Sequence, residues 1–240
     1  MDAKKLLEAI LADPDPNSDR VGRLQNDLLR EYGSGYPIEN LRPLLHSENE
    51  RLLDTGLFIA DELGRKASPL LGDLFPLLKH PREQVRFEVL CCLQTCTGPS
   101  DKLELASAVA LLDDAATSVR WKAMDFMRGA SRDNLQAALS YLEATEPKSR
   151  HVIGLRWLLG PGANNPEEIT IALKNPDSDI RKYAAVAAAR ISDSHSGPLF
   201  FASTTGDSEI KNFADHQINL YKMRLEQKAR RAARNRPAQG

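Results

Sequence analysis

Three aromatic side chains occupy one position of a repeated pattern and are the best candidates to contact another molecule. Phe87, Trp121 and His151 each directly follow an arginine and are 34 and 30 residues apart. In a stack of helix pairs, equivalent positions of successive pairs lie side by side, so we expect one strip of rings on the inner, concave face. Large aromatic side chains outside a core are preferred anchors for protein partners. The alternative is that the three rings pack against the neighbouring helix pair and are not available to a partner. Trp157 is a separate case, and we expect its side chain in the core.

The arginines before these rings belong to a column of basic residues that runs through the sequence. Its seven positions, one of them a leucine, are Arg20, Leu53, Arg86, Arg120, Arg150, Arg181 and Lys211, spaced by 33, 33, 34, 30, 31 and 30 residues. Arg86 and Arg120 are candidates to bind an acidic group of a partner. A structural role is the other interpretation, in which each guanidinium binds helix-end carbonyls and a carboxylate of a turn, such as Asp113, Asp114, Asp177 or Asp179. We favour the structural role, because two-bond pairing between arginine and carboxylate suits a repeated position.

The residue types that hold metals or perform catalysis do not form a recognisable set. Cys91, Cys92 and Cys96 have no histidine or further cysteine at a zinc-like spacing nearby, so we expect them to be small buried side chains. The sequence has no phosphate-binding loop and no nucleophile elbow around a serine. We therefore predict no catalytic residue, no metal and no cofactor.

Helical periodicity predicts the elements that must position these residues. Apolar side chains fall at the first, fifth, eighth and ninth positions of three segments: Val85, Val89, Cys92 and Leu93; Val119, Ala123, Phe126 and Met127; Ile180, Ala184, Ala187 and Ala188. This spacing predicts one buried stripe on each helix. Ser68-Pro69 and Asn165-Pro166 each offer a capping side chain followed by proline in the first turn. No segment alternates long enough to indicate a strand, so the predicted fold class is all-α.

The repeated columns resemble the HEAT-repeat family in its short bacterial form, the type also seen in PBS-lyase HEAT-like repeats. Clear copies are Leu77-Leu78 with Val85-Arg86, Leu111-Leu112 with Val119-Arg120, and Ala172-Leu173 with Ile180-Arg181. The resemblance covers roughly residues 5–220 and implies a right-handed α-solenoid of about seven stacked helical hairpins. We expect a single repeat domain over 1–221 and a basic C-terminal tail, helical or disordered, over 222–240. The His-Glu pairs that build the di-iron site of HEAT-repeat deoxyhypusine hydroxylases are absent, which excludes that enzyme.

Charge is distributed unevenly along the 240 residues, although the formal net charge is −1. From Lys222 onward the chain has seven basic residues and one acidic residue, so this tail carries +6 and residues 1–221 carry −7. Neither a secretory signal nor an apolar run long enough to span a membrane is present. An odd, clustered cysteine count favours a reducing compartment. We expect a cytoplasmic protein that is a monomer when free.

One catalytic group of HEAT-like proteins, the alkylpurine DNA glycosylases, resembles this chain at three positions. Those enzymes cradle a damaged base with tryptophan, aspartate and arginine on the concave face. Trp121 and Asp125 are four residues apart on one helix face here, and Arg156 follows on the next repeat. The acidic body argues against this activity, because phosphate neutralisation supplies most of the non-specific affinity for DNA. We keep the glycosylase as the alternative function and regard nucleic acid as an improbable partner.

The sequence therefore predicts a non-enzymatic protein-binding module that engages a partner protein on its concave face. The predicted contact residues are Phe87, Trp121, His151, Arg86, Arg120, Asp125 and Arg156. A bacterial immunity protein that neutralises a basic toxin by charge complementarity fits this description. An adaptor or assembly factor that binds a subunit of a complex fits equally well.

Overall fold

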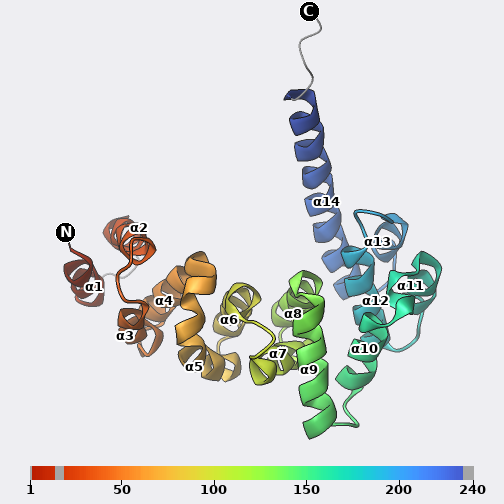
Figure 1. The fold of residues 1–240 in the computed structure, drawn as a ribbon, viewed down its shortest axis with the longest axis horizontal. Helices are drawn as coiled ribbons and strands as arrows, with labels where there is room; N and C mark the ends of the chain where they lie inside the picture. Colours follow the sequence, from red (N-terminus) through yellow and green to blue (C-terminus); the bar gives the residue numbers. More distant parts are fainter. Residues whose placement is uncertain (1, 14–18, 235–240) are drawn as a thin grey trace, which may run out of the picture. The chain divides into compact units, whose positions relative to one another are not determined.

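The computed structural model describes residues 2–13 and 19–234, and every regular element in this part of the chain is a helix (Figure 1). Contacts within the chain define two compact units, Met1–Phe126 (unit 1) and Met127–Gly240 (unit 2). The boundary falls inside one helix, α8 (Thr117–Gly129). In each unit a first helical segment leads through a short turn into a second helix, so the chain is an all-α helical repeat protein.

Unit 1 contains four helix pairs. The first segments are α1 (Ala3–Leu11), η1 (Ile38–Leu41) with α3 (Arg42–Leu45), η2 (Gly64–Leu70) with α5 (Leu71–Leu74) and η3 (Phe75–Lys79), and α7 (Lys102–Ala110) with η4 (Leu111–Asp113). The second helices are α2 (Asp19–Gly33), α4 (Glu50–Leu63), α6 (Glu83–Cys96) and α8. α4 packs against both α2 and α6, so the second helices form one continuous layer.

Prolines explain why the first segment of the third pair is broken into short pieces. Pro69 lies inside η2 and Pro76 in the first turn of η3. Proline has no N–H to donate, which interrupts a regular α-helical ladder. The prediction that Ser68 caps a helix is wrong: its hydroxyl donates to the carbonyls of Arg65 and Cys96, at 2.8 and 2.7 Å.

The core of unit 1 follows the predicted stripe. Val85, Val89, Cys92 and Leu93 of α6 are each 0% exposed. Cys96 is also buried, while Cys91 is partly exposed, and all three cysteines are free thiols. Burial raises the pKa of all three thiols, that of Cys96 to about 12. The prediction of small buried side chains is confirmed for Cys92 and Cys96.

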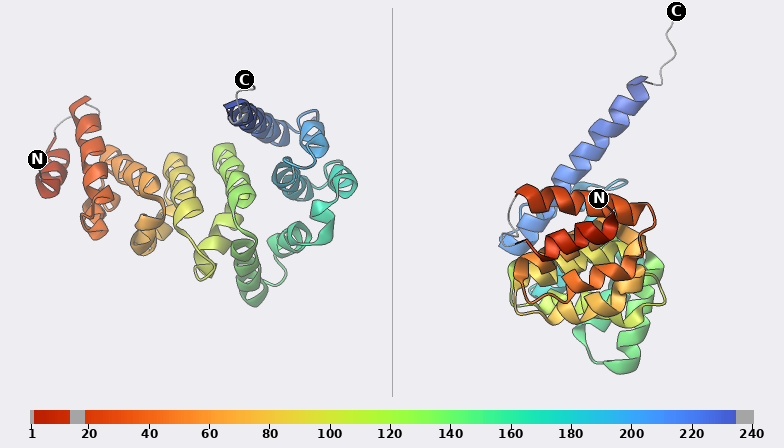
Figure 2. Two further views of the ribbon diagram at one scale, coloured as in Figure 1. Left: turned by 45° about the horizontal axis from the view of Figure 1, so that its top comes forward. Right: turned by 90° about the vertical axis from the view of Figure 1, so that its left-hand side faces the viewer.

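Unit 2 contains three further pairs. Their first segments are α9 (Arg132–Thr145), η5 (Pro161–Asn164) with α11 (Pro166–Ala172), and α13 (Gly197–Ala202), and the second helices are α10 (Arg150–Leu159), α12 (Ser178–Arg190) and α14 (Ser208–Arg234). Asn165 caps α11 as predicted, because its side chain accepts the N–H of Glu167 at 3.0 Å. In Figure 1 and the right-hand view of Figure 2, the C-terminal part of α14 projects beyond the other helices of unit 2.

A close approach between α10 and α12 changes the predicted stripe of unit 2. The ring of Tyr183, 2% exposed, fills the space that a side chain at Gly154 would need. Tyr183 occupies the buried side of α12 together with the alanines from 184 to 189. The prediction that Ile180 belongs to the core is therefore wrong: its side chain is 37% exposed.

Candidate protein-binding site

The rings of Phe87 and Trp121 meet as predicted from their equivalent positions. Their centroids are 6.4 Å apart and their planes differ by 12°, so the rings are stacked between α6 and α8. Both residues are partly exposed. A stacked aromatic pair is rigid and has a large apolar area, so little conformational entropy is lost when it contacts a partner.

A buried lysine lies beside this pair. Lys122 is 8% exposed, and its Nζ lies 6.0 Å from the centroid of the Phe87 ring. The ammonium group donates to Gln94 Oε1 at 2.9 Å and to Asp125 Oδ2 at 3.1 Å. A buried ammonium needs such acceptors, because desolvation of an unpaired charge is expensive.

This arrangement corrects the role predicted for Asp125. Its side chain faces inward, where it is 8% exposed and accepts the bond from Lys122, and its main-chain carbonyl accepts a long bond of 3.4 Å from Gln94 Nε2. The carboxylate thus satisfies a buried cation from within its own unit. The expectation of a surface carboxylate at this position is wrong.

The arginine column makes the same contacts in successive pairs. Arg86 Nη1 donates to the carbonyls of His80 and Pro81 at 2.7 and 3.0 Å, six and five residues earlier. Arg120 Nη1 donates to the carbonyls of Asp114 and Ala115 at 2.8 and 3.0 Å, again six and five residues earlier. Each guanidinium therefore satisfies the turn that precedes its own helix.

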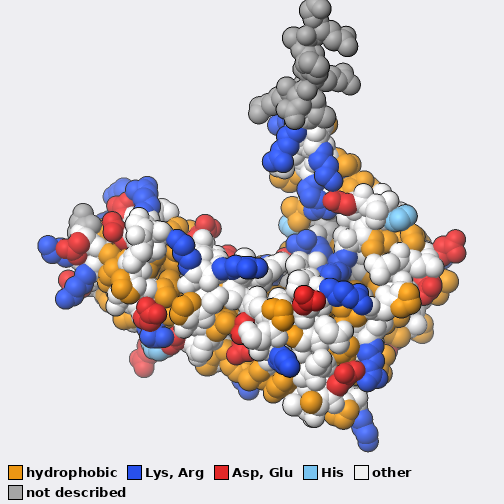
Figure 3. All heavy atoms as spheres, viewed as in Figure 1, with side chains coloured by type: hydrophobic (Ala, Val, Ile, Leu, Met, Phe, Trp, Pro, Cys, Tyr) orange, Lys and Arg blue, Asp and Glu red, His pale blue; other side chains and the backbone are white. Residues whose placement is uncertain are grey.

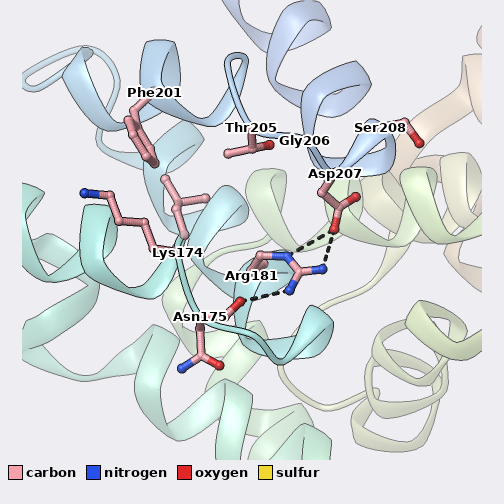
Figure 4. Close-up of a pocket in the computed structure, with 9 residues that line it drawn as sticks. Lys174, Asn175, Arg181, Phe201, Thr205, Gly206, Asp207 and Ser208 are labelled. Atoms are coloured by element: carbon pink, nitrogen blue, oxygen red, sulfur yellow. Dashed lines mark hydrogen bonds and ion pairs between the residues drawn. The ribbon is translucent and has the colours of Figure 1, made fainter.

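Three of these arginines also bind a carboxylate in the next pair. Arg86 pairs with Asp114 through two bonds, Arg150 pairs with Asp179 at 2.6 Å, and Arg181 pairs with Asp207 at 2.7 Å. Figure 4 shows Arg181 directed at both Asp207 and the carbonyl of Asn175, which it binds at 2.8 Å. These are the contacts expected if the arginine column has a structural role, because each guanidinium binds main-chain carbonyls or a carboxylate within the chain.

The two candidate residues of unit 2 lie in different environments. His151 is 5% exposed, and its Nδ1 lies 3.2 Å from the hydroxyl oxygen of Tyr183. The expectation of an exposed imidazole is therefore wrong, because the imidazole packs against the hydroxyl group of the buried Tyr183. Arg156 is exposed, and its Nε donates to Glu143 Oε1 at 2.8 Å.

Two pockets of the second helices were not predicted. In unit 1, a pocket of about 470 Å³ is lined by Arg51, Asp54 and Phe58 of α4, by Arg82 just before α6 and by Glu88 of α6. In unit 2, Trp157, predicted to be in the core, is partly exposed and lines an apolar pocket of about 230 Å³ with Ile153, Ile180 and Tyr183. The sequence signal for the first pocket was Asp54, which replaces the aromatic residue at this position of the repeat.

The helices α4, α6 and α8 each contribute one aromatic residue: Phe58, Phe87 and Trp121. We give the name aromatic–ionic face to these three residues together with Asp54, Arg82 and Glu88. Phe58 is 41% exposed. Phe87 and Glu88 are neighbours on α6, so the stacked rings and the unit 1 pocket share that helix.

Within residues 2–13 and 19–234, no group of three or more histidine, cysteine, aspartate or glutamate side chains is arranged to hold a metal ion. No helix in the same residues is long and apolar enough to cross a membrane.

Comparison with known proteins finds similar solved structures but no match of the sequence. No family model and no curated protein matches the sequence. A solved engineered protein is similar at a TM-score of 0.49 and 17% identity, over 91% of this chain and 98% of that chain. A designed armadillo repeat protein has a TM-score of 0.46 and 13% identity, over 91% and 99%. Another designed armadillo repeat protein, solved in complex with the peptide (KR)4, has a TM-score of 0.40 and 18% identity, over 77% and 99%.

Proposed function

We propose that this chain is a protein-binding helical repeat module and that unit 1 binds a basic protein partner through the aromatic–ionic face. The observation that carries the proposal is the stacked, partly exposed Phe87–Trp121 pair, whose helix α6 also contributes Glu88 to a pocket lined by charged residues. Aromatic anchors of this kind provide most of the binding energy at many protein interfaces. The buried Lys122, held by Gln94 and Asp125, lies against the ring of Phe87. We therefore expect the rings to have the same arrangement in the free protein and in the complex.

Charge supports the choice of a basic partner. Residues 1–126 contain 21 acidic and 15 basic residues, whereas residues 127–240 contain 12 acidic and 17 basic residues. An acidic unit attracts a basic protein over a distance and accelerates capture. The partner we infer is a basic toxin, which the module neutralises by steric blockage, or a basic subunit of a complex, for which it is an adaptor.

The DNA glycosylase alternative loses one of its three residues. Asp125 is bound by Lys122 in the interior of unit 1 and is therefore unsuited to stabilise a reacting base at the surface. Figure 3 shows lysine and arginine side chains along the projecting part of α14, in unit 2. That helix belongs to the unit that lacks Trp121 and Asp125.

Affinity capture from the source organism tests the proposal. Wild type is compared with Trp121→Ala and with Trp157→Ala, which replaces a tryptophan of unit 2 and is the matched control. Urea unfolding first shows that each variant is folded under the capture conditions. We expect a discrete basic protein that is retained by wild type and Trp157→Ala and lost with Trp121→Ala. Equal loss in both variants, or excision of alkylated bases from DNA by wild type, contradicts the proposal.

A further inference from the structure

The unit 1 pocket joins an exposed ring to a partly buried set of charges. Phe58 of α4 lines the pocket together with Asp54, one turn earlier on α4, and with Arg82 and Glu88. Arg82 Nη2 donates to Asp54 Oδ2 at 3.2 Å, and Arg82 Nε lies 3.5 Å from Glu50 Oε2. The carboxylates of Asp54 and Glu88 and two guanidinium groups, those of Arg51 and Arg82, therefore line the pocket, and Glu50 lies beside Arg82.

Three polar atoms in this pocket have no hydrogen-bond partner among the described residues. They are Asp54 Oδ1, Glu88 Oε2 and Arg82 Nη1, each buried. The other oxygen of Glu88 accepts a bond of 2.7 Å from Gln84 Nε2. Buried polar groups in folded proteins are almost always paired with protein or water, so three such atoms in one pocket mark a place where a ligand's polar groups can bind. The carboxyl groups rotate easily about their last bonds, so a ligand in the pocket can reach these oxygens.

The local charge indicates which kind of partner is missing. Burial raises the pKa of Glu88, and the neighbouring carboxylates Asp54 and Asp61 raise it further, against the opposite effects of Gln84 and Arg82. The carboxyl group of Glu88 is thus partly desolvated, and its Oε2 has no donor among the described residues. A cation that enters the pocket relieves this repulsion and supplies donors to both unpaired oxygens.

We propose that the pocket binds an arginine side chain of the protein partner, with its guanidinium between Asp54 and Glu88 and against the ring of Phe58. This inference rests on the proposed protein-binding function and specifies the partner's chemistry. A planar guanidinium has five N–H donors, binds carboxylates through charge-assisted bonds and stacks on aromatic rings. A main-chain carbonyl of the same partner provides the acceptor that Arg82 Nη1 lacks. A hard metal ion fits less well, because it needs six or more oxygens and would lie beside the guanidinium of Arg82.

Titration with small probes tests this pocket directly on the full chain. N-acetyl-arginine amide is compared with N-acetyl-citrulline amide, which has the same shape without the charge, while NMR follows the ring signals of Phe58. We expect millimolar binding of the arginine probe, with shifts at Phe58, and much weaker binding of the citrulline probe. Equal binding of both probes, or shifts that map elsewhere, overturns the proposal.

A matched pair of variants identifies the carboxylate. Glu88→Gln and Glu83→Gln remove the same charge from α6, but Glu83 is exposed and does not line the pocket. We expect Glu88→Gln to weaken the arginine probe by about fivefold or more, because it removes one charge-assisted bond, and Glu83→Gln to change the affinity less than twofold. Equal losses of affinity in the two variants would show that the probe responds to the overall negative charge of α6, and they would overturn the proposal that it binds in the pocket. If partner capture is lost with Trp121→Ala but survives Glu88→Gln, the pocket proposal fails while the protein-binding function stands.

Discussion

Arg86 and Asp114 are joined by two parallel hydrogen bonds of 2.7 Å, and their side chains are only 14% and 7% exposed. The first residue lies on α6 and the second in the turn before α8, so this bridge connects two successive helix pairs. Arg86 also binds two carbonyls of its own turn. One side chain therefore satisfies four acceptors.

Replacement of this arginine by lysine tests its structural role. Arg86→Lys keeps the charge but cannot reproduce the planar fork, so a carboxylate and two carbonyls lose bonds in a partly buried site. We expect the free energy of unfolding to fall by about 2 kcal/mol, measured by urea denaturation. Arg30→Lys is the control, because Arg30 is 78% exposed and pairs with Asp27 on its own helix, and it should change stability by less than ~0.5 kcal/mol. Similar losses in both variants would show that Arg86 has no special structural role.

The same bridge predicts an acid-sensitive contribution to stability. Burial raises the pKa of Asp114, but the bonds from Arg86 and from the N–H of Ala116 outweigh it and hold that pKa below its ordinary value. A carboxyl group with a lowered pKa in the folded state stabilises the protein above its unfolded-state pKa, and the contribution is lost as the pH falls through the folded-state value. The difference in unfolding free energy between wild type and Asp114→Asn should therefore shrink as the pH is lowered toward this range. A constant gap for Asp114→Asn refutes the prediction.

Gly154 is predicted to be essential for the packing of α10 on α12. A methyl group at this position would overlap three carbons of the Tyr183 ring. Gly154→Ala gains about 1 kcal/mol from helix propensity but should lose about 1–3 kcal/mol from overpacking. We expect a net loss of about 1 kcal/mol in urea denaturation.

Two further variants separate overpacking from a general effect of substitution. Gly72→Ala has no atom within 4 Å of the new carbon and should not destabilise the protein. Gly154→Ala should cost less in a Tyr183→Leu background than in wild type, because the smaller side chain leaves room. A Gly154→Ala penalty that is unchanged in this background would show that the ring is not the cause.

The three cysteines should react in a fixed order. Cys91 is partly exposed, while Cys92 and Cys96 are buried, and burial raises the thiol pKa of all three. Only the thiolate is a good nucleophile, so all three should react slowly at neutral pH. Mass spectrometry after iodoacetamide treatment should find Cys91 modified first, and Cys92 and Cys96 only after unfolding in urea. Early modification of Cys92 would contradict the packing of α6.

The periodic part of the sequence predicts the fold because each repeat imposes the same local requirements. The stripe that begins at Val85 is buried as expected, and Arg86 and Arg181 bind the turns that their spacing indicates. These positions depend on contacts within a pair or between adjacent pairs. A pattern with a fixed period carries that information directly.

The candidate site is less predictable, because the orientation of a single side chain depends on its particular neighbours. Asp125 faces inward because Lys122 needs an acceptor, and His151 is buried because Gly154 admits the ring of Tyr183. The unit 1 pocket combines residues of three helices, α2, α4 and α6, that are far apart in the sequence. No spacing rule connects Phe58 with Glu88, so a structure was needed to bring them together.

The bridges between successive pairs restrict how this chain can change length. Arg86 and Asp114 are 28 residues apart, Arg150 and Asp179 are 29 apart, and Arg181 and Asp207 are 26 apart. A deletion inside one pair would leave a guanidinium without its carboxylate, whereas removal of a whole repeat would bring the arginine of one pair to the aspartate of the next surviving pair. Insertions and deletions should therefore be tolerated in steps of about one repeat. Homologues of different length are expected to differ by whole numbers of helix pairs.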